Sequence, residues 1–142
     1  GLLALAALAS PSHGVIARAV RRRRLARAVA LDDLLASLYR AQERAAPAQT
    51  PPAHSALRTA RARGLVDRAS LALTDAGLAR ASEIVRRHRL WESYLVDRAG
   101  LAPDHVHAPA EVLEHLPASP LPAPPEHERD PHGRPIPPQR HA

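Results

Sequence analysis

Three of the four histidines and all three glutamates between residues 86 and 116 have the types and the spacing that metal binding needs. His88 and Glu92 are four residues apart, so on a helix both side chains would point the same way. A second helix would carry the other four on one stripe, with a histidine one turn ahead of residues at i, i+3 and i+4: His107, Glu111, Glu114 and His115. Because the chain has no cysteine, only nitrogen and oxygen ligands are available, and this mixture suits Mn²⁺ or Fe²⁺, with Zn²⁺ as a competitor.

The alternative interpretation is that these residues form the ordinary polar face of two exposed helices. A histidine and a glutamate at i, i+4 mainly support the helix, and an isolated pair is more often solvated than bound to a metal. The repetition of the spacing on two neighbouring helices favours the metal site. The other histidines show no such spacing, and we expect them in solvent: His13, His54, His105, His127, His132 and His141.

The composition limits the architecture that can position these residues. A chain of 142 residues fits one modest domain or two very small ones. Hydrophobic residues make up 45% but many are alanine, and aromatic residues make up only 2%, so we expect thin helical packing of leucine and valine. All 20 basic residues are arginine, which is typical of a GC-rich genome. The net charge of +6 still favours contact with nucleic acid or an anionic membrane surface.

Residues 31–74 have the pattern of two helices followed by a small ribbon. Leucines at helical spacing predict a helix over 31–44, which the prolines of "AAPAQTPPAH" bring to an end. A short helix follows at 55–63, with Ser55 as its N-cap and a glycine as its stop. Two short β-prone stretches complete the segment. This order is typical of a winged helix-turn-helix.

Residues 75–116 are predicted to form two helices that carry the candidate ligands. Thr74 caps a long helix over 75–99, and a second helix begins near Pro109, a favoured residue of a first turn. A hairpin around Gly100–Pro103 would turn the two polar stripes toward each other. The predicted metal site depends on this hairpin.

The two ends of the chain differ from its middle. Residues 1–30 open with the apolar "GLLALAALAS" and continue with six arginines between Arg18 and Arg27. An apolar stub followed by positive charge is typical of the cytoplasmic end of a transmembrane helix, and the alternative is an amphipathic helix of a soluble protein. Residues 117–142 contain nine prolines among 26 residues, which predicts an extended or disordered tail rather than a helix.

The segments "RRHRLWESYLV", "VHAPAEVLEHL" and "DPHGRPIP" resemble the metal-binding and dimerisation domain of the DtxR/MntR family of iron- and manganese-dependent transcriptional repressors. The resemblance extends from about Leu31 to Pro137. It implies a mainly α fold, in which a degenerate winged helix-turn-helix precedes a helical metal-binding and dimerisation domain, and a homodimer. If the chain pairs, we expect the apolar faces around Leu95 and Leu113 to form the interface, because a two-fold dimer uses one patch twice. The resemblance also implies an ancillary metal set of His88, Glu92 and His107, and a primary set of Glu111, Glu114, His115 and Asp33.

The same resemblance bears on the choice of metal and on DNA. Glu111 stands where manganese-type members have glutamate, whereas Ala36 replaces their second acidic ligand on the first helix. The helix that reads DNA would be 55–63, but "AAPAQTPPAH" leaves no room for the supporting helix of roughly eight residues that precedes it. The residues available for DNA contact are Ser55, Arg58, Thr59, Arg61 and Arg63.

Two functions follow as expectations, and neither is enzymatic. The first is a metal-responsive, DNA-binding transcriptional regulator in the cytoplasm, in which metal promotes dimerisation. The second follows from the N-terminal stub, which resembles the start of the cytoplasmic tail of manganese/zinc/iron ABC-transporter permeases that carry a fused repressor-like module. The chain would then be a fragment that lies at the inner face of the membrane and senses metal. We expect no enzyme, because the sequence has no nucleophile motif, phosphate loop or HExxH run.

Overall fold

The computed structural model of the chain describes residues 15–47, 52–115, 120–126 and 128–139, in which the regular elements are helices. In chain order they are α2 (Val15–Glu43), α3 (His54–Ala62), α4 (Asp75–Asp97), the short 3₁₀ helix η1 (Pro103–His105) and α5 (His107–Glu114). The predicted mainly α fold is confirmed. The apolar stretch on which the membrane end was predicted, residues 1–14, lies outside the described residues. None of the described helices is long and apolar enough to cross a bilayer.

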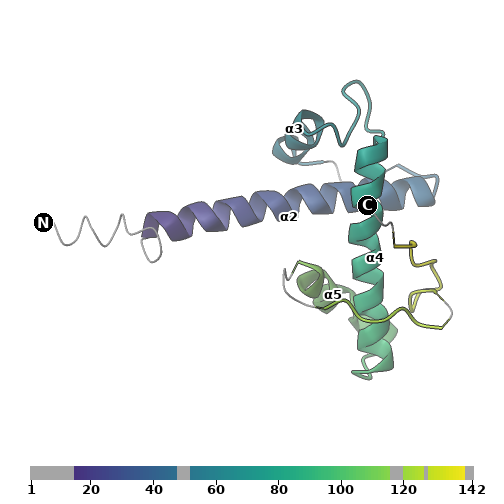
Figure 1. The fold of residues 1–142 in the computed structure, drawn as a ribbon. Coiled ribbons are helices and arrows are strands. Elements are labelled where there is room, and N and C mark those ends of the chain that lie inside the picture. The colour runs from purple at the N-terminus through teal and green to yellow at the C-terminus, as the bar shows by residue number, and fades with distance from the viewer. Residues whose placement is uncertain (1–14, 48–51, 116–119, 127, 140–142) are drawn as a thin grey trace, which may run out of the picture.

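Helix α2 begins at Val15, well before the predicted start at Leu31. No glycine or proline interrupts it, and alanine, arginine and leucine are good helix formers. Figure 1 shows the N-terminal half of α2 projecting away from the other helices, and residues 18–28 are all exposed. One continuous helix therefore joins the arginine-rich segment to the part of α2 that crosses α4.

Two separate apolar clusters hold the helices together. The first joins the second half of α2 to α3 and the start of α4, with Leu35 and Ala81 fully buried. The second joins the end of α4 to α5, around Trp91 and Leu95. Because Leu95 is already packed inside the chain, only the half-buried Leu113 remains available from the predicted pairing face. The candidate ligands lie between the two clusters.

The junction between α3 and α4 is tight and depends on two residues. Thr74 caps α4 as predicted, since its hydroxyl accepts a hydrogen bond from the Gly77 amide at 3.1 Å. A Cβ atom at Gly77 would lie 1.8 Å from the carbonyl oxygen of Leu65, so this close approach requires glycine. The predicted ribbon is reduced to a single antiparallel bridge between Val66 and Leu73.

Three helix ends differ from the prediction. Ser55 is not an N-cap, because α3 starts one residue earlier and Ala53 occupies the cap position without a side-chain hydrogen bond. Helix α4 ends at Asp97, two residues early. Helix α5 starts at His107, which places Pro109 inside its first turn.

The proline-rich end is not helical where the structure describes it, as predicted, but part of it is an ordered hairpin. An antiparallel bridge joins Arg129 to Pro135. The guanidinium of Arg89, only 2% exposed, ties this hairpin to α2. It donates to both carboxylate oxygens of Glu43, at 3.0 and 2.6 Å, and to the Pro135 carbonyl at 2.6 Å, while its Nε lies 3.4 Å from Asp130.

Candidate metal site

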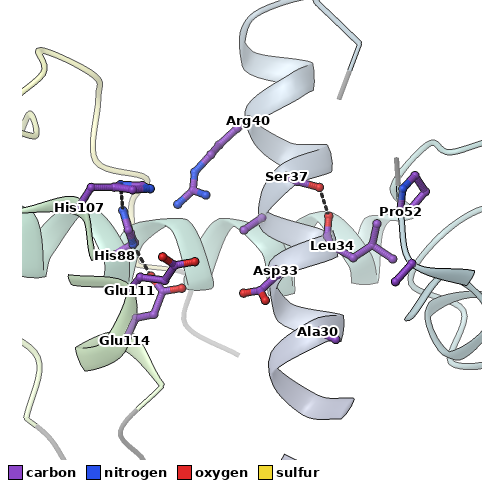
Figure 2. A pocket seen from close by; sticks show the side chains of 12 residues that line it. Ala30, Asp33, Leu34, Ser37, Arg40, Pro52, His88, His107, Glu111 and Glu114 are labelled. Atoms are coloured by element: carbon purple, nitrogen blue, oxygen red, sulfur yellow. Dashed lines mark hydrogen bonds and ion pairs between the residues drawn. The ribbon is translucent and has the colours of Figure 1, made fainter. Parts of the chain in front are cut away.

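Three helices supply the predicted ligands to one region of the molecule. His88 and Glu92 lie on the buried face of α4, with 3% and 1% of their surfaces exposed, and Glu114 at the end of α5 is 6% exposed. Figure 2 shows the side chains of α4 and α5 facing Asp33 of α2 across a cavity of about 390 Å³. The polar stripes therefore face each other, as the hairpin prediction requires.

The first ligand group consists of His88, Glu92 and His107. His88 Nε2 lies 3.1 Å from Glu92 Oε1 and 3.0 Å from His107 Nδ1, and the last two atoms are 3.1 Å apart. The three atoms therefore form a nearly equilateral triangle. Donors about 2.1–2.2 Å from a six-coordinate ion lie roughly 3.0–3.1 Å apart at right angles, which is the spacing found here. Because His107 is exposed, this group is open to solvent on one side.

The second group consists of Asp33, Glu114 and His115. His115 Nε2 lies 3.5 Å from Asp33 Oδ1 and 3.6 Å from Glu114 Oε1. This nitrogen is buried and has no hydrogen-bond partner among the described residues. An unsatisfied buried nitrogen is costly, and an ion between it and the two carboxylates would satisfy it. The donor set of this group therefore fits a divalent cation.

A short hydrogen bond connects the two groups. His88 Nδ1 lies 2.5 Å from Glu114 Oε2, so Glu114 contacts a histidine of each group. Burial acts to lower the pKa of His88, but hydrogen bonds to Glu114 and Glu92 outweigh it, and the pKa is raised above its usual value. For Glu92, burial acts to raise the pKa, yet the hydrogen bonds with His88 and His107 lower it to about 2. Glu92 is therefore ionised near neutral pH.

Glu111 is placed near these groups but belongs to neither of them. Its exposed side chain lines the same cavity as Asp33, His88 and Glu114. Burial raises the pKa of Asp33, His115 opposes this shift, and the negative charge of Glu111 adds to it. Of the predicted primary set, the structure thus brings Asp33, Glu114 and His115 together, while Glu111 stays at the cavity wall.

Sequence reasoning missed two residues beside the site. His132 was expected in solvent, but its imidazole is half-buried and its Nε2 lies 3.9 Å from Glu92 Oε1. The signal was the "DPHGRPIP" segment, whose hairpin carries His132 to α4. Arg40 lines the cavity from α2, and no spacing rule singled it out. His105 is 76% exposed, as expected.

The predicted DNA-contacting residues do not form a uniform surface. Ser55, Arg58 and Arg63 are exposed on or next to α3. Arg61 instead donates hydrogen bonds to the carbonyls of Asp67 and Ser70, at 3.2 Å each, and so holds the turn that follows the helix. Thr59 donates to the Ser55 carbonyl at 2.8 Å. In the described part of the segment between α2 and α3 there is no helix that could support α3 as a DNA-recognition helix.

Comparison with known proteins identifies this region. Residues 74–119 match the family described as "Iron dependent repressor, metal binding and dimerisation domain". A solved structure of a manganese-dependent transcriptional repressor in complex with manganese is 37% identical with a TM-score of 0.52, over 60% of this chain and 45% of that one. A "Probable metal transport system membrane protein" of Chlamydia trachomatis serovar D is 57% identical over 44 residues, which are 31% of this chain and 10% of that protein.

The chain thus spans less than half of the repressor and a tenth of the transport protein. All three matches point to proteins that handle metal ions. The resemblance predicted from the sequence is confirmed: residues 74–119 are similar to the metal-binding and dimerisation domain of iron-dependent repressors.

Proposed function

We propose that this chain is a metal-responsive regulatory module that binds Mn²⁺ or Fe²⁺ between α2, α4 and α5. The observation that carries the proposal is the triangle of His88, Glu92 and His107, whose spacing suits one six-coordinate ion. The manganese-bound repressor and the iron-dependent repressor family support the choice of metal. Oxygen and imidazole ligands without sulfur are also the donor set that such ions accept.

The two ligand groups have different roles in this proposal. His88 would bind through Nε2 while its Nδ1–H donates to Glu114, because a carboxylate commonly orients a metal-binding histidine in this way. The other oxygen of Glu114, with Asp33 and His115, would hold a second ion. Glu111 lies at the wall of the same cavity and would join this second set by a change of side-chain rotamer. The ion itself supplies positive charge that pulls the three helices together.

Binding at this place would stabilise the arrangement of α2 against α4 and α5. The ligands come from three helices, so an ion that bridges them opposes their separation. The matched family is described as a metal-binding and dimerisation domain, and we propose that metal favours a homodimer of this chain. Size-exclusion chromatography with light scattering, with Mn²⁺ and with a chelator, measures this directly. A constant mass in both conditions would contradict metal-dependent pairing.

Calorimetric titration of Mn²⁺, Fe²⁺ and Zn²⁺ tests the site. The double variant Glu114→Gln/His115→Gln should bind Mn²⁺ at least about tenfold more weakly than wild type, because it loses one ligand charge and one buried nitrogen donor. The matched control is His105→Gln, which removes an exposed imidazole from the neighbouring η1. Equal, weak binding by all three proteins would refute the proposed function.

The output of the module has two candidate forms. The first is DNA binding through the exposed Ser55, Arg58 and Arg63, which the similarity to a transcriptional repressor supports. The second is a cytosolic, metal-sensing tail of a manganese/zinc/iron ABC-transporter permease, tethered to the inner face of the membrane. The 57% identity to a metal transport membrane protein favours the second form. The genomic sequence upstream of Gly1 distinguishes them: an in-frame series of apolar helices supports the tail, and a nearby start codon supports the free regulator.

A further inference from the structure

The wall of the metal cavity contains a positive charge that the proposed ligand set does not use. Arg40 lies on α2 one helical turn after Ala36 and two turns after Asp33, so these residues share one face of the helix. All three line the cavity, opposite His88 and Glu114. Figure 2 shows the Arg40 guanidinium reaching into the space between α2 and the ligands of α4 and α5.

The surroundings of the half-buried Arg40 differ from those of the buried Arg89. Arg89 is held by Glu43, by Asp130 and by a backbone carbonyl. No hydrogen bond or ion pair of this kind fixes the Arg40 side chain within the described ranges of the chain. Burial lowers the pKa of Arg40, the carboxylates of Glu114 and Glu92 oppose that shift, and the charges of Arg89 and Arg134 add to it. An arginine stays protonated under such conditions, so its charge is directed at the ligand carboxylates without a fixed partner.

The ligand carboxylates need such a charge when no metal is present. Glu92 and Glu114 are buried, and Asp33 and Glu111 add further negative charge at the same cavity. Carboxylates in a partly buried site repel one another and are stabilised by a nearby cation. Ala36, one turn before Arg40 on the same cavity wall, carries only a methyl group and leaves space beside the guanidinium.

We propose that Arg40 is the internal counter-ion of the metal site and sets the metal concentration at which the site fills. The inference rests on the proposed function, because it assigns a regulatory residue to that same site. The guanidinium compensates the carboxylates in the metal-free protein and repels an arriving divalent cation. Its charge therefore lowers the affinity for metal, so that the site fills only at higher metal concentrations.

Replacement of Arg40 tests this inference against a matched control. Arg40→Gln should bind Mn²⁺ about tenfold or more tighter than wild type in calorimetry, since it removes a unit charge from a half-buried site. Arg44→Gln is the control, because Arg44 is exposed in the turn directly after α2 and the change in net charge is the same. Its affinity should stay within about twofold of wild type, as expected for a screened surface charge.

A second variant separates the charge of Arg40 from its shape. Arg40→Lys keeps the charge and should bind Mn²⁺ as wild type does. In chelator, Arg40→Gln should also melt at a lower temperature than wild type. On addition of Mn²⁺, its melting temperature should rise by more than that of wild type. The inference would be overturned if wild type and Arg40→Gln bound Mn²⁺ with equal affinity, or if Arg40→Gln and Arg40→Lys changed the affinity by the same factor. Either result would leave the proposed metal site standing. Failure of every protein to bind Mn²⁺ would instead refute the proposed function, and this inference with it.

Discussion

At the scale of single residues, His88 is the side chain on which the site depends. Its two ring nitrogens face different carboxylates, Glu114 through Nδ1 and Glu92 through Nε2. A neutral imidazole carries only one proton and can donate to only one of them. In the metal-free protein both contacts are satisfied best by the charged imidazolium, which agrees with the raised pKa of His88. A metal ion on Nε2 would replace one of those protons.

This leads to opposite pH dependences for the metal-free and the metal-bound protein. The raised pKa of His88 means that its charged form contributes stability below the ordinary value of 6.5, and that this stability is lost as pH rises through the folded-state pKa. In chelator, the melting temperature should therefore fall between pH 6.5 and 8.5. His88→Gln should reduce this slope and His105→Gln should not. An unchanged slope in His88→Gln would contradict the assignment.

Metal affinity should change in the opposite direction. His88, His107 and His115 must be neutral to bind an ion, so the affinity for Mn²⁺ should decrease as pH drops from 7.5 to 5.5. Glu92 does not contribute to this decrease, because its pKa of about 2 keeps it ionised throughout. Calorimetry at three pH values measures the effect. An affinity that stays constant over this range would argue against histidine ligation.

At the scale of elements, the junction of α3 and α4 allows a test of the fold without touching the site. A Cβ atom at Gly77 would meet the Leu65 carbonyl oxygen at 1.8 Å, so Gly77→Ala must push the segment after α3 away from α4. We expect a loss of about 1–3 kcal/mol in the free energy of unfolding, which is typical of overpacking. Ala76→Ser, at an exposed position of the same turn, is the control. Chemical denaturation measures both, and equal stabilities would contradict the close approach.

Local signals were enough to predict most of the elements. The helical spacing of the leucines in α2 and the side chain of Thr74 are local signals, so the helix and the cap of α4 could be predicted from them. The early start of α2 was missed because the arginine segment has no apolar face, although alanine and arginine favour a helix. The hairpin at 128–136 was missed because it depends on the buried Arg89, whose partners are distant in sequence.

The site was predictable to the same extent. Spacing alone placed Glu92 one turn after His88, and Glu114 and His115 one turn after Glu111, because i, i+3 and i+4 relations are fixed by the helix. It could not show that Glu111 stays at the cavity wall, or that Arg40 reaches into it. Those positions depend on how α2 and α5 pack against α4, and helix packing is determined by contacts across the whole interface.

At the scale of the whole molecule, α2 connects two regions of opposite charge. Its N-terminal part carries six arginines and no acidic residue, and it projects into solvent. Its second half supplies Asp33 to the metal site. Because the helix is continuous, a surface that holds the arginines also fixes the orientation of Asp33 relative to that surface. A membrane-tethered tail would use this geometry to keep the metal site at a fixed distance from the transporter.

The two candidate outputs predict different ligands for the arginine-rich segment. A membrane-side tail should bind vesicles that contain anionic phosphatidylglycerol but not vesicles of neutral phosphatidylcholine. Arg22→Gln/Arg23→Gln/Arg24→Gln should weaken this binding by about tenfold or more, because each arginine near an anionic surface contributes about 1 kcal/mol. The control Arg58→Gln/Arg63→Gln, with exposed charges on or next to α3, should leave it unchanged. Sedimentation with vesicles at low and high salt measures both. If Mn²⁺-dependent binding to duplex DNA is found instead, and if it is the α3 variant that loses it, the chain acts as a DNA-binding regulator and the membrane-side tail is refuted.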